Sequence, residues 1–359
     1  MFRGEIKTSD VKSAIKDGKA EKMKEELQYI RFSKSYRKIE RGTVITPSTI
    51  IWGYPHIARV YTLENGIKRN IKNDIFYLEE KIDGYNLRVA LVAGKLFAFT
   101  RGGYADPFAT EKVREMQQLK KFFSDHPSLV LCGEMIGNTP FTPPTDKFDV
   151  KLLVFDIDTG MKYVPPVKKY HLLAKYKIDA VPFLGRFDKT QLQLVAKIAA
   201  YLHKGKKEGM VIKSADRASV IKYVTPFADI EDIGRGAYTF FDLPDGFFLQ
   251  RILRSSYFID DFALGRKEYG EKLGSAFYAG LTKAIDDVRA GKDIEEEFEV
   301  LVSNRKIFES ILSHMGREVG IKLISSSEEK GKLRIRFSKV FRNTTSALRE
   351  LHRGKAIID

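Results

Sequence analysis

The start of the chain divides into a helical part and a β-like part. Residues 9–30 carry apolar side chains at helical spacing among many lysines and glutamates, and Ser9 or Asp10 can cap the first turn. We therefore expect one surface helix over these residues. From Thr43 onward the chain has short β-prone runs separated by turn residues, which are Pro47, Gly53 and Pro55. Residues 1–62 thus predict a small N-terminal lobe.

Residues 63–236 predict a larger α+β domain built on an antiparallel sheet. The turn Ala93-Gly94-Lys95 joins two strands as a hairpin. Strands and helices do not alternate strictly, so an antiparallel sheet is favoured over a doubly wound parallel one. The strand-like runs are 76–80, 86–92, 96–101, 129–135, 152–157, 209–213 and 219–224. The helical patterns are 110–123, 167–175 and 191–203.

The last third of the chain predicts a helical domain followed by a small α+β domain. Residues 237–318 form the helical domain, with helical periodicity over 247–264, 269–289 and 295–316. Its aromatic side chains can form an internal core or a subunit interface, where aromatics are enriched. These aromatics are Phe248, Tyr257, Phe258, Phe262, Phe277 and Tyr278. Residues 319–359 form the C-terminal domain, with strands and a helix at 321–325, 332–337 and 344–352.

The predicted C-terminal hairpin has one strongly positive face. Basic residues alternate with Leu333, Ile335 and Phe337 along its second strand. The basic residues are Lys332, Arg334, Arg336 and Lys339. This face can be a solvated surface or can contact RNA, and the net charge of the chain favours RNA.

Composition restricts the class of protein and of partner. A chain of 359 residues exceeds the usual size of one hydrophobic core, so several domains are expected. The formal charge of +15, from 62 Lys and Arg against 47 Asp and Glu, favours a polyanionic partner. A surface rich in ion pairs could explain the 30% of charged residues but not this excess of positive charge.

The remaining compositional features indicate a soluble, cytoplasmic protein without a membrane partner. The single cysteine, Cys132, excludes an intrachain disulfide and lies in an apolar run, so we expect it to be a small buried hydrophobe. No segment resembles a signal peptide or approaches membrane-spanning length. The histidines are scattered and do not have metal-ligand spacing.

The strongest chemical signal is a set of short motifs in a fixed order on strand-like segments. The first motif, Glu80-Lys81-Ile82-Asp83-Gly84-Tyr85-Asn86, contains the pattern Lys-x-Asp-Gly. The later motifs are Thr100-Arg101-Gly102-Gly103, Gly133-Glu134, Phe155-Asp156 and Glu208-Gly209-Met210-Val211-Ile212-Lys213. One such pattern alone is weak, but the ordered set is difficult to obtain by chance. It predicts a lysine that becomes nucleotidylated.

Attack on phosphorus requires the neutral amine of Lys81, whereas a free lysine with a pKa of roughly 10.4 is protonated at neutral pH. Neighbouring cations disfavour a further positive charge, and the candidates are Lys213, Lys222, Arg101 and a bound metal. Gly84 allows a turn directly after the nucleophile, where Asp83 can orient Lys81 or its partners. In isolation, Asp-Gly would indicate only a hairpin turn.

These residues resemble the covalent nucleotidyltransferases, a superfamily of DNA ligases, RNA ligases and messenger-RNA capping enzymes. Within it, the chain is most similar to the archaeal, homodimeric, ATP-dependent RNA ligases. The motif likeness spans residues 76–224, and the order of domains is similar over nearly the whole chain. The Lys-x-Asp-Gly-x-Asn form, and the absence of a recognisable OB-fold tail, favour RNA over DNA.

The resemblance implies ATP as donor, Lys81 as the adenylated residue and Asn86 near the phosphates. Arg101 would bind a phosphate or the RNA 5′ end, for which a guanidinium is suited. Glu208 would bind Mg²⁺, or Mn²⁺ in its place, because such ions prefer a few carboxylates together with phosphate oxygens. Asp83 would support the catalytic lysine.

The other site residues that the resemblance implies surround the base, the ribose and the phosphates. Glu134 would hold the ribose hydroxyls, and Glu79 would also contact the nucleotide. Phe155 would stack on adenine and Val211 would cover its other face, although core packing also explains an isolated phenylalanine.

Lys213 and Lys222 would neutralise the α-phosphate and the leaving pyrophosphate. As ordinary strand residues, both lysines could instead point to water. The last motif of the family often has two lysines one residue apart, whereas Ile221-Lys222-Tyr223-Val224 has one. Lys213 is a candidate for the second cationic role.

The resemblance therefore implies a ligase that joins RNA 5′-phosphate and 3′-hydroxyl ends through ligase-(lysyl)-AMP and RNA-adenylate intermediates. An ATP-dependent DNA ligase and a GTP-using RNA capping enzyme share the same lysine and are the alternatives within the superfamily. An RNA-binding protein that retains the fold without catalysis is the alternative outside it. The resemblance also implies a homodimer, which we expect to form through the helical domain.

Overall fold

The computed structural model describes residues 6–315 and 320–356. Its first part is a small lobe with one short helix and a four-stranded sheet of order β1-β2-β3-β4. The β-prone runs after Thr43 are confirmed as short strands. The elements are α1 (Thr8–Lys16), β1 (Ala20–Lys24), β2 (Gln28–Phe32), β3 (Val44–Ile45) and β4 (Ile50–Ile51).

The single helix expected over residues 9–30 is wrong beyond Lys16. Gly18 has φ +63°, a left-handed conformation that glycine adopts without steric cost. The amide of Lys19 donates to the carbonyl of Ala14 at 2.8 Å, as in a helix end closed by such a glycine. The chain then reverses into the antiparallel pair β1 and β2.

The main domain contains two sheets, and this confirms the α+β class with antiparallel pairing. One sheet has the order β10-β9-β7-β8, and the other has the order β11-β6-β12-β13-β5. The only parallel pair in these two sheets is β13 with β5. The strands are β5 (Ala58–Arg59), β6 (Phe76–Lys81), β7 (Tyr85–Val92), β8 (Lys95–Thr100), β9 (Val130–Gly137), β10 (Val150–Asp158), β11 (Phe183–Phe187), β12 (Gly209–Ser214) and β13 (Val220–Val224).

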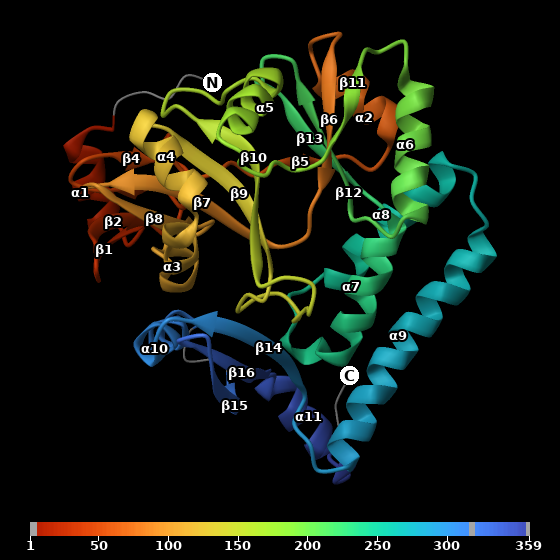
Figure 1. Ribbon diagram of the computed structural model, residues 1–359. Helices are drawn as coiled ribbons and strands as arrows, with labels where there is room; N and C mark the ends of the chain where they lie inside the picture. The colour runs from red at the N-terminus through yellow and green to blue at the C-terminus, as the bar shows by residue number, and fades with distance from the viewer. Residues whose placement is uncertain (1–5, 316–319, 357–359) are drawn as a thin grey trace.

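Helices of the main domain cover these sheets (Figure 1). The helix expected over residues 110–123 is two helices, because the backbone of Met116 is extended. The first of them begins earlier than expected, since Asp106 caps it and Pro107 occupies its first turn. The helices are α2 (Leu63–Asn70), α3 (Pro107–Glu115), α4 (Gln117–Asp125), α5 (Pro166–Lys175) and α6 (Leu192–Lys204).

The C-terminal third begins with helices that run alongside the five-stranded sheet and then away from it (Figure 1). The helices are α7 (Pro226–Tyr238), the 3₁₀ turn η1 (Phe240–Asp242), α8 (Phe247–Asp261) and α9 (Arg266–Arg289). The smaller unit at the end contains β14 (Glu295–Val302), α10 (Arg305–His314), β15 (Gly320–Glu329), β16 (Lys332–Val340) and α11 (Arg342–His352).

The helix expected over residues 295–316 is wrong in its first half. Phe298, Val300 and Val302 alternate with more exposed residues, which is the period of a strand buried on one face. The strand β14 pairs with β16 to give a sheet of order β14-β16-β15. This sheet therefore combines strands from both sides of the expected boundary at residue 318. The hairpin and the last helix are confirmed.

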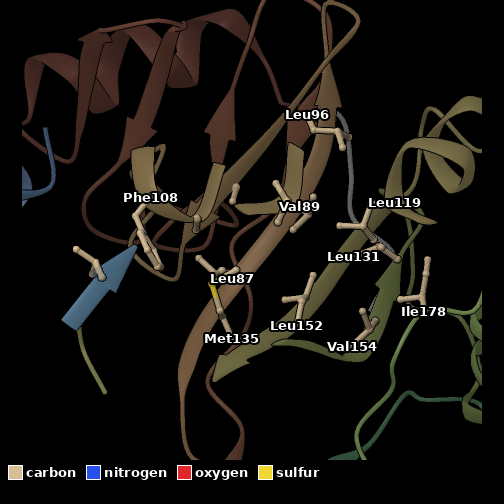
Figure 2. Close-up of a cluster of buried hydrophobic side chains, with 14 of the residues drawn as sticks. Leu87, Val89, Leu96, Phe108, Leu119, Leu131, Met135, Leu152, Val154 and Ile178 are labelled. Atoms are coloured by element: carbon tan, nitrogen blue, oxygen red, sulfur yellow. The ribbon is translucent and has the colours of Figure 1, made fainter. Parts of the chain in front are cut away.

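One hydrophobic core joins the main domain to the C-terminal sheet. Leu87 and Val89 of β7 belong to the same buried cluster as Phe298 of β14 and Phe337 of β16. Figure 2 shows part of this cluster, in which Phe108 of α3 lies beside a strand from the C-terminal part of the chain. The two units are therefore packed on each other rather than connected only by a linker.

The positive face expected on the C-terminal hairpin is largely neutralised. Lys332 forms an ion pair with Glu115 of α3 at 2.6 Å, and Arg336 pairs with Glu297 at 3.1 Å. Arg334 pairs with Glu299 and Glu329. Carboxylates of neighbouring elements thus occupy these cations, which weakens the case for RNA contact through this face.

Cys132 is buried, as expected. Among the helices of the described residues, none has the length and apolar composition needed to cross a bilayer.

Candidate active site

The site lies on the face of the five-stranded sheet where β6 ends in Lys81. Pairing of β6 with β12 and of β12 with β13 places Glu79, Val211 and Lys222 side by side in one row. Side chains in register on neighbouring strands share a face of the sheet. Residues that are far apart in sequence therefore converge because of strand register.

Beside this row is a cavity of about 150 Å³. Every residue that the family resemblance assigns to the nucleotide lines it: Glu79, Lys81, Asn86, Arg101, Glu134, Phe155, Val211, Lys213 and Lys222. Sequence reasoning missed its other lining residues, which are Tyr54, Ile57, Glu80, Ile82 and Val181. Glu80 and Ile82 flank Lys81 within the first motif but were given no role, whereas Tyr54, Ile57 and Val181 carry no motif and only the fold brings them to the cavity.

Lys81 is paired with the residue expected to bind metal. Its Nζ lies 2.5 Å from Oε1 of Glu208, and both side chains are only partly exposed. Burial raises the pKa of Glu208, an effect that the positive charge of Lys81 opposes. The second oxygen of Glu208, Oε2, is buried and has no hydrogen-bond partner within the described part of the chain.

Asn86 and Glu134 form a wall of the cavity that belongs to the sheet of order β10-β9-β7-β8. They are register partners on β7 and β9, and Nδ2 of Asn86 donates to Oε2 of Glu134 at 3.3 Å. Burial raises the pKa of Glu134 to about 7, although Lys81 and Asn86 act in the opposite direction. Oδ1 of Asn86 is also buried without a partner among the described residues. This wall thus presents polar atoms that a ligand could satisfy.

A buried charged network forms the floor of the cavity. Nζ of Lys213 donates to Oε2 of Glu79 and to the carbonyl of Phe155, both at 2.6 Å, and to Oδ1 of Asp156 at 3.0 Å. Lys169 donates to Oε1 of Glu79 at 2.6 Å and to the same carbonyl at 2.9 Å. All three protons of the Lys213 ammonium are therefore used within the protein, and none is left for a phosphate.

Asp156 is held from its other side by Arg217 and Tyr54. Arg217 donates to both carboxylate oxygens, and the Tyr54 hydroxyl donates to Oδ2 at 2.5 Å. Burial alone would raise the pKa of Asp156, but Arg217 and Lys213 outweigh it and hold the pKa well below its usual range. Asp156 is thus a buried carboxylate that stays ionised.

Phe155 is fixed by its backbone and its ring. Its carbonyl receives two ammonium groups, and the Tyr54 ring contacts its ring edge-on at a centroid distance of 5.1 Å. Phe155 and Val211 are both partly exposed to the cavity. Two apolar side chains that line one cavity suit the faces of a planar base.

The remaining expected residues lie near the mouth of the cavity. Burial lowers the pKa of Lys222 to about 8, and the charges of Arg59, Lys81 and Arg101 add to this effect. Arg101 is exposed, and Asp83 is exposed in the turn after Lys81. Asp83 does not line the cavity, but its charge influences Glu134 and Glu208.

The donor set fits a divalent cation only if a ligand shares in its coordination. Within residues 6–315 and 320–356, no group of three or more His, Cys, Asp or Glu side chains could enclose a metal. The unpartnered oxygen of Glu208 is available as one ligand. Mg²⁺ and Mn²⁺ sites that use one or two carboxylates together with phosphate oxygens have this composition.

Two family models match consecutive parts of the chain. The model described as RNA ligase matches residues 74–224, which include the whole cavity face of the five-stranded sheet except β5. The model described as the C-terminal region of ligase Pab1020 matches residues 236–355. The two matches leave mainly the N-terminal lobe outside.

A relative and two solved structures are similar over nearly the full length. The uncharacterized protein MJ0414 of Methanocaldococcus jannaschii is 32% identical over 346 residues, covering 90% of this chain and 87% of that protein. A putative ATP-dependent DNA ligase from Aquifex aeolicus has a TM-score of 0.90 and 31% identity, covering 97% of this chain and 99% of that one. An archaeal ATP-dependent RNA ligase has a TM-score of 0.89 and 27% identity, covering 98% and 97%.

The matches to both halves of the chain and to whole ligase structures agree with the cavity built around the motif lysine. The chain therefore belongs to the archaeal RNA ligase family.

Proposed function

We propose that this ligase is ATP-dependent and joins the 5′-phosphate and 3′-hydroxyl ends of RNA through a lysyl-AMP and an RNA-adenylate. The observation that carries the proposal is the amine of Lys81 at the edge of a cavity lined by base-sized apolar, ribose-binding and cationic side chains. The similar archaeal structure is described as an ATP-dependent RNA ligase, which supports the choice of donor and substrate.

In the first step, the lone pair of Lys81 Nζ attacks the α-phosphorus of ATP. A nitrogen–phosphorus bond forms, the bond from the α-phosphorus to the bridging oxygen breaks, and pyrophosphate leaves with that electron pair. Before the attack the Lys81 ammonium passes one proton to Oε1 of Glu208, which lies 2.5 Å from Nζ. The nitrogen releases a second proton to water once its bond to phosphorus has formed. Lys222 and Arg101 supply positive charge for the phosphates.

Phe155 and Val211 would enclose the adenine, and Glu134 would accept hydrogen bonds from the ribose hydroxyls. We assign Lys213 a different role from the one expected. Because its ammonium is bonded to Glu79, Asp156 and the carbonyl of Phe155, it supports the base pocket instead of contacting phosphate. Lys222 then carries the lysine contribution at the α-phosphate.

Glu208 would hold a Mg²⁺ or Mn²⁺ ion through its free oxygen, with Asp83 near enough to influence the same site. Such an ion supplies positive charge that neutralises the phosphates of ATP when it is bound. Asn86, through its unpartnered Oδ1, would add a neutral acceptor to the lining of the cavity.

In the later steps, a terminal 5′-phosphate oxygen of RNA attacks the phosphorus of lysyl-AMP, and the bond to Lys81 breaks. A 3′-hydroxyl oxygen then attacks the RNA phosphorus, releases AMP and leaves a phosphodiester. A DNA ligase is the second candidate, because the similar Aquifex aeolicus structure is described as a putative DNA ligase. Sealing of 5′-phosphorylated RNA faster than of the DNA of the same sequence supports the RNA assignment, and the reverse order contradicts it.

The central test is covalent labelling of the full chain with ATP labelled at the α-phosphate. The Lys81→Ala variant should incorporate no label because the attacking amine is gone, whereas wild type should incorporate it in the presence of Mg²⁺. Lys204→Ala, at an exposed position of α6, is the matched control and should be labelled like wild type. Labelling of the Lys81→Ala variant would refute the nucleophile, and labelling of wild type by GTP but not ATP would refute the donor.

A homodimer through the helical domain is part of the proposal. Leu249, Leu253 and Tyr257 recur at every fourth position of α8 and are 69%, 45% and 45% exposed. On α9, Tyr278 is 68% exposed and Phe277 is 39% exposed. Such an apolar stripe is unusual on a surface that only contacts water. Of the aromatics noted in the sequence, Phe258 instead belongs to the core.

Substitution of the stripe in the full chain tests this dimer. Leu249→Glu combined with Leu253→Glu should shift the sedimentation of the protein from dimer to monomer, because charges would have to be buried at the interface. Lys306→Glu, on the exposed side of α10, should leave the dimer intact. A monomeric wild type, or a dimeric double variant, would contradict the proposal.

A further inference from the structure

The row of side chains that faces the cavity continues by one strand beyond the family motifs. Parallel pairing of β13 with β5 makes Arg59 the register partner of Lys222, and the amide of Val60 donates to the carbonyl of Lys222 at 3.0 Å. Glu79, Val211, Lys222 and Arg59 thus lie in sequence across four strands. Arg59 therefore stands beside Lys222 on the same face of the sheet.

The guanidinium of Arg59 has unused hydrogen-bonding capacity. Its Nε is buried and lacks a partner among the residues that the structure describes. The carboxylate of Asp229 lies close enough to be influenced by Arg59, but it is already bonded by Arg254 and Ser255. A buried N–H without an acceptor costs free energy, so such a group commonly marks a place that a ligand completes.

Further cations surround the same place. Nη2 of Arg101 lies 3.1 Å from Nδ1 of His56, which is in the loop that leads into β5. The charges of Arg101, Arg41 and Lys222, together with burial, lower the pKa of His56, whereas the carboxylate of Glu40 acts in the opposite sense. Arg59 and Arg101 both act on Lys222. We define the basic rim as Arg41, His56, Arg59, Arg101 and Lys222.

The rim has the chemistry of a phosphate site. Guanidinium groups bind phosphate through paired N–H donors. Several neighbouring positive charges also attract a phosphate dianion more strongly than a single positive charge does. The rim draws on the N-terminal lobe for Arg41 and on the main domain for Arg59, Arg101 and Lys222, with His56 in the loop between the two parts. A phosphate bound there would join the two parts of the protein across the mouth of the cavity.

We propose that Arg59, with Lys222, Arg101 and His56, binds a phosphate group that lies beyond the α-phosphate attacked by Lys81. This inference rests on the proposed function. Two phosphates of the reaction have the required chemistry: the pyrophosphate portion of ATP and the terminal 5′-phosphate of the RNA. Arg59 binds this group and does not itself make or break a bond.

The test compares wild type with Arg59→Met, which keeps the aliphatic stem but removes the guanidinium. Two half-reactions are measured separately on the full chain: self-adenylation by ATP with its reversal by pyrophosphate, and transfer of AMP from isolated ligase-AMP to a 5′-phosphorylated RNA. A loss of about tenfold or more is expected in one of them. Loss in the first assigns the site to pyrophosphate, and loss in the second assigns it to the RNA end.

Two further variants distinguish loss of the guanidinium from a folding defect as the cause of a lower rate. Arg59→Lys keeps the charge without the forked donors and should recover part of the lost rate, which a folding defect in Arg59→Met would not explain. Arg69→Met, at an exposed position of α2, should behave like wild type. Rates of Arg59→Met within twofold of wild type in both half-reactions would overturn the proposal.

Direct binding separates failure of this site from failure of the proposed function. Calorimetry with pyrophosphate, and with RNA bearing either a 5′-phosphate or a 5′-hydroxyl, needs no catalysis. The Arg59→Met protein should bind pyrophosphate or the phosphorylated RNA about tenfold more weakly, with no change for the hydroxyl RNA. If wild type and Arg59→Met bound pyrophosphate equally well, and also bound the phosphorylated RNA equally well, the site would be refuted even if wild type formed no adenylate.

Discussion

The carboxylate of Glu79 receives one ammonium group on each oxygen, from Lys169 and from Lys213. All three side chains are essentially buried. Removing one lysine from this network leaves a buried carboxylate without one of its partners. The resulting loss of stability exceeds the net contribution of the intact ion pair. The network therefore holds the carbonyl of Phe155, and with it the proposed adenine platform, in one position.

We predict that Lys169→Met lowers the free energy of unfolding by about 3 kcal/mol, because Glu79 loses one of its two buried partners. It should also raise the ATP concentration needed for half-maximal self-adenylation, since Phe155 is held less firmly. Urea unfolding and a titration with labelled ATP measure the two effects. Lys168→Met, the exposed neighbour on α5, should change neither, and equal stability of both variants would contradict the role of Lys169.

Sequence motifs predicted several residues that line the cavity, but no motif marks the residues that hold them in place. Lys81, Glu134 and Phe155 were found because each lies in a recognisable pattern, and all line the cavity. Lys169 was missed because it is one of several lysines on its helix, and its partner Glu79 is 90 residues away. Arg59 was missed because only the pairing of β5 with β13 brings it to the site.

Among helices and strands, the local sequence pattern predicted most elements correctly. It failed where one residue, or a short alternation of residues, favoured a different structure from the longer segment around it. The helix expected over 9–30 ends at a single glycine, Gly18, that outweighs the surrounding helix formers. The run Glu295–Val302 is rich in glutamate, yet the alternation of Phe298 and Val300 decides its structure. The edge strand β11 was missed because it is short and irregular, with φ +140° at Gly185.

Gly209 of β12 lies between Lys81 of β6 and Val224 of β13, its register partners on the two neighbouring strands. It is the register partner of Lys81 and has φ +152°, and a Cβ there would lie 2.1 Å from the carbonyl oxygen of Tyr223. Gly209→Ala should therefore push β13 away from β12 and displace Lys222. We expect at least tenfold slower self-adenylation and a loss of roughly 2 kcal/mol in unfolding free energy.

A matched glycine substitution controls for this effect. Gly270 lies in α9, where an added Cβ would meet no atom within 4 Å. Gly270→Ala should keep wild-type activity and slightly raise stability, because alanine favours a helix over glycine. Measured rates of Gly209→Ala equal to those of Gly270→Ala would show that the spacing between β12 and β13 is not critical.

At the scale of the whole molecule, the C-terminal sheet is held against the main domain by polar as well as apolar contacts. Lys112 of α3 donates to the carbonyl of Leu301 at 2.5 Å, and the amide of Ser303 donates to Glu111 at 3.1 Å. Lys339 of β16 lies over the rings of Phe141 and Phe298, at 4.4 and 4.3 Å from their centroids. The ring of Phe141 in turn contacts Tyr85, which belongs to the Lys81 motif.

Lys339 gives the interface a defined pH dependence. Burial lowers its pKa to about 8, with Glu296 raising it and Arg235 lowering it further. In the unfolded chain a lysine keeps its proton up to roughly pH 10.4. Between these values the unfolded state binds more protons, so this group makes the free energy of unfolding rise with pH.

Lys339→Met should remove that rise. We expect the free energy of unfolding of the variant to exceed that of wild type by most below pH 8. This difference should shrink by on the order of 2 kcal/mol toward pH 10, because Lys339 of wild type loses its buried positive charge. Urea unfolding of both proteins at pH 7 and pH 10 measures the difference. Lys330→Met, at the exposed hairpin turn, should show no such change. A constant difference between Lys339→Met and wild type would contradict the buried charge.

The core shared by the main domain and the C-terminal sheet has a consequence for how this protein is made. A ribosome completes Leu87 and Val89 long before it reaches Phe298 and Phe337, although all four belong to one cluster. The nascent ligase domain must therefore wait with part of its apolar surface uncovered until nearly the last residues emerge. Synthesis, rather than the finished enzyme, is the stage at which a chaperone would find most to bind.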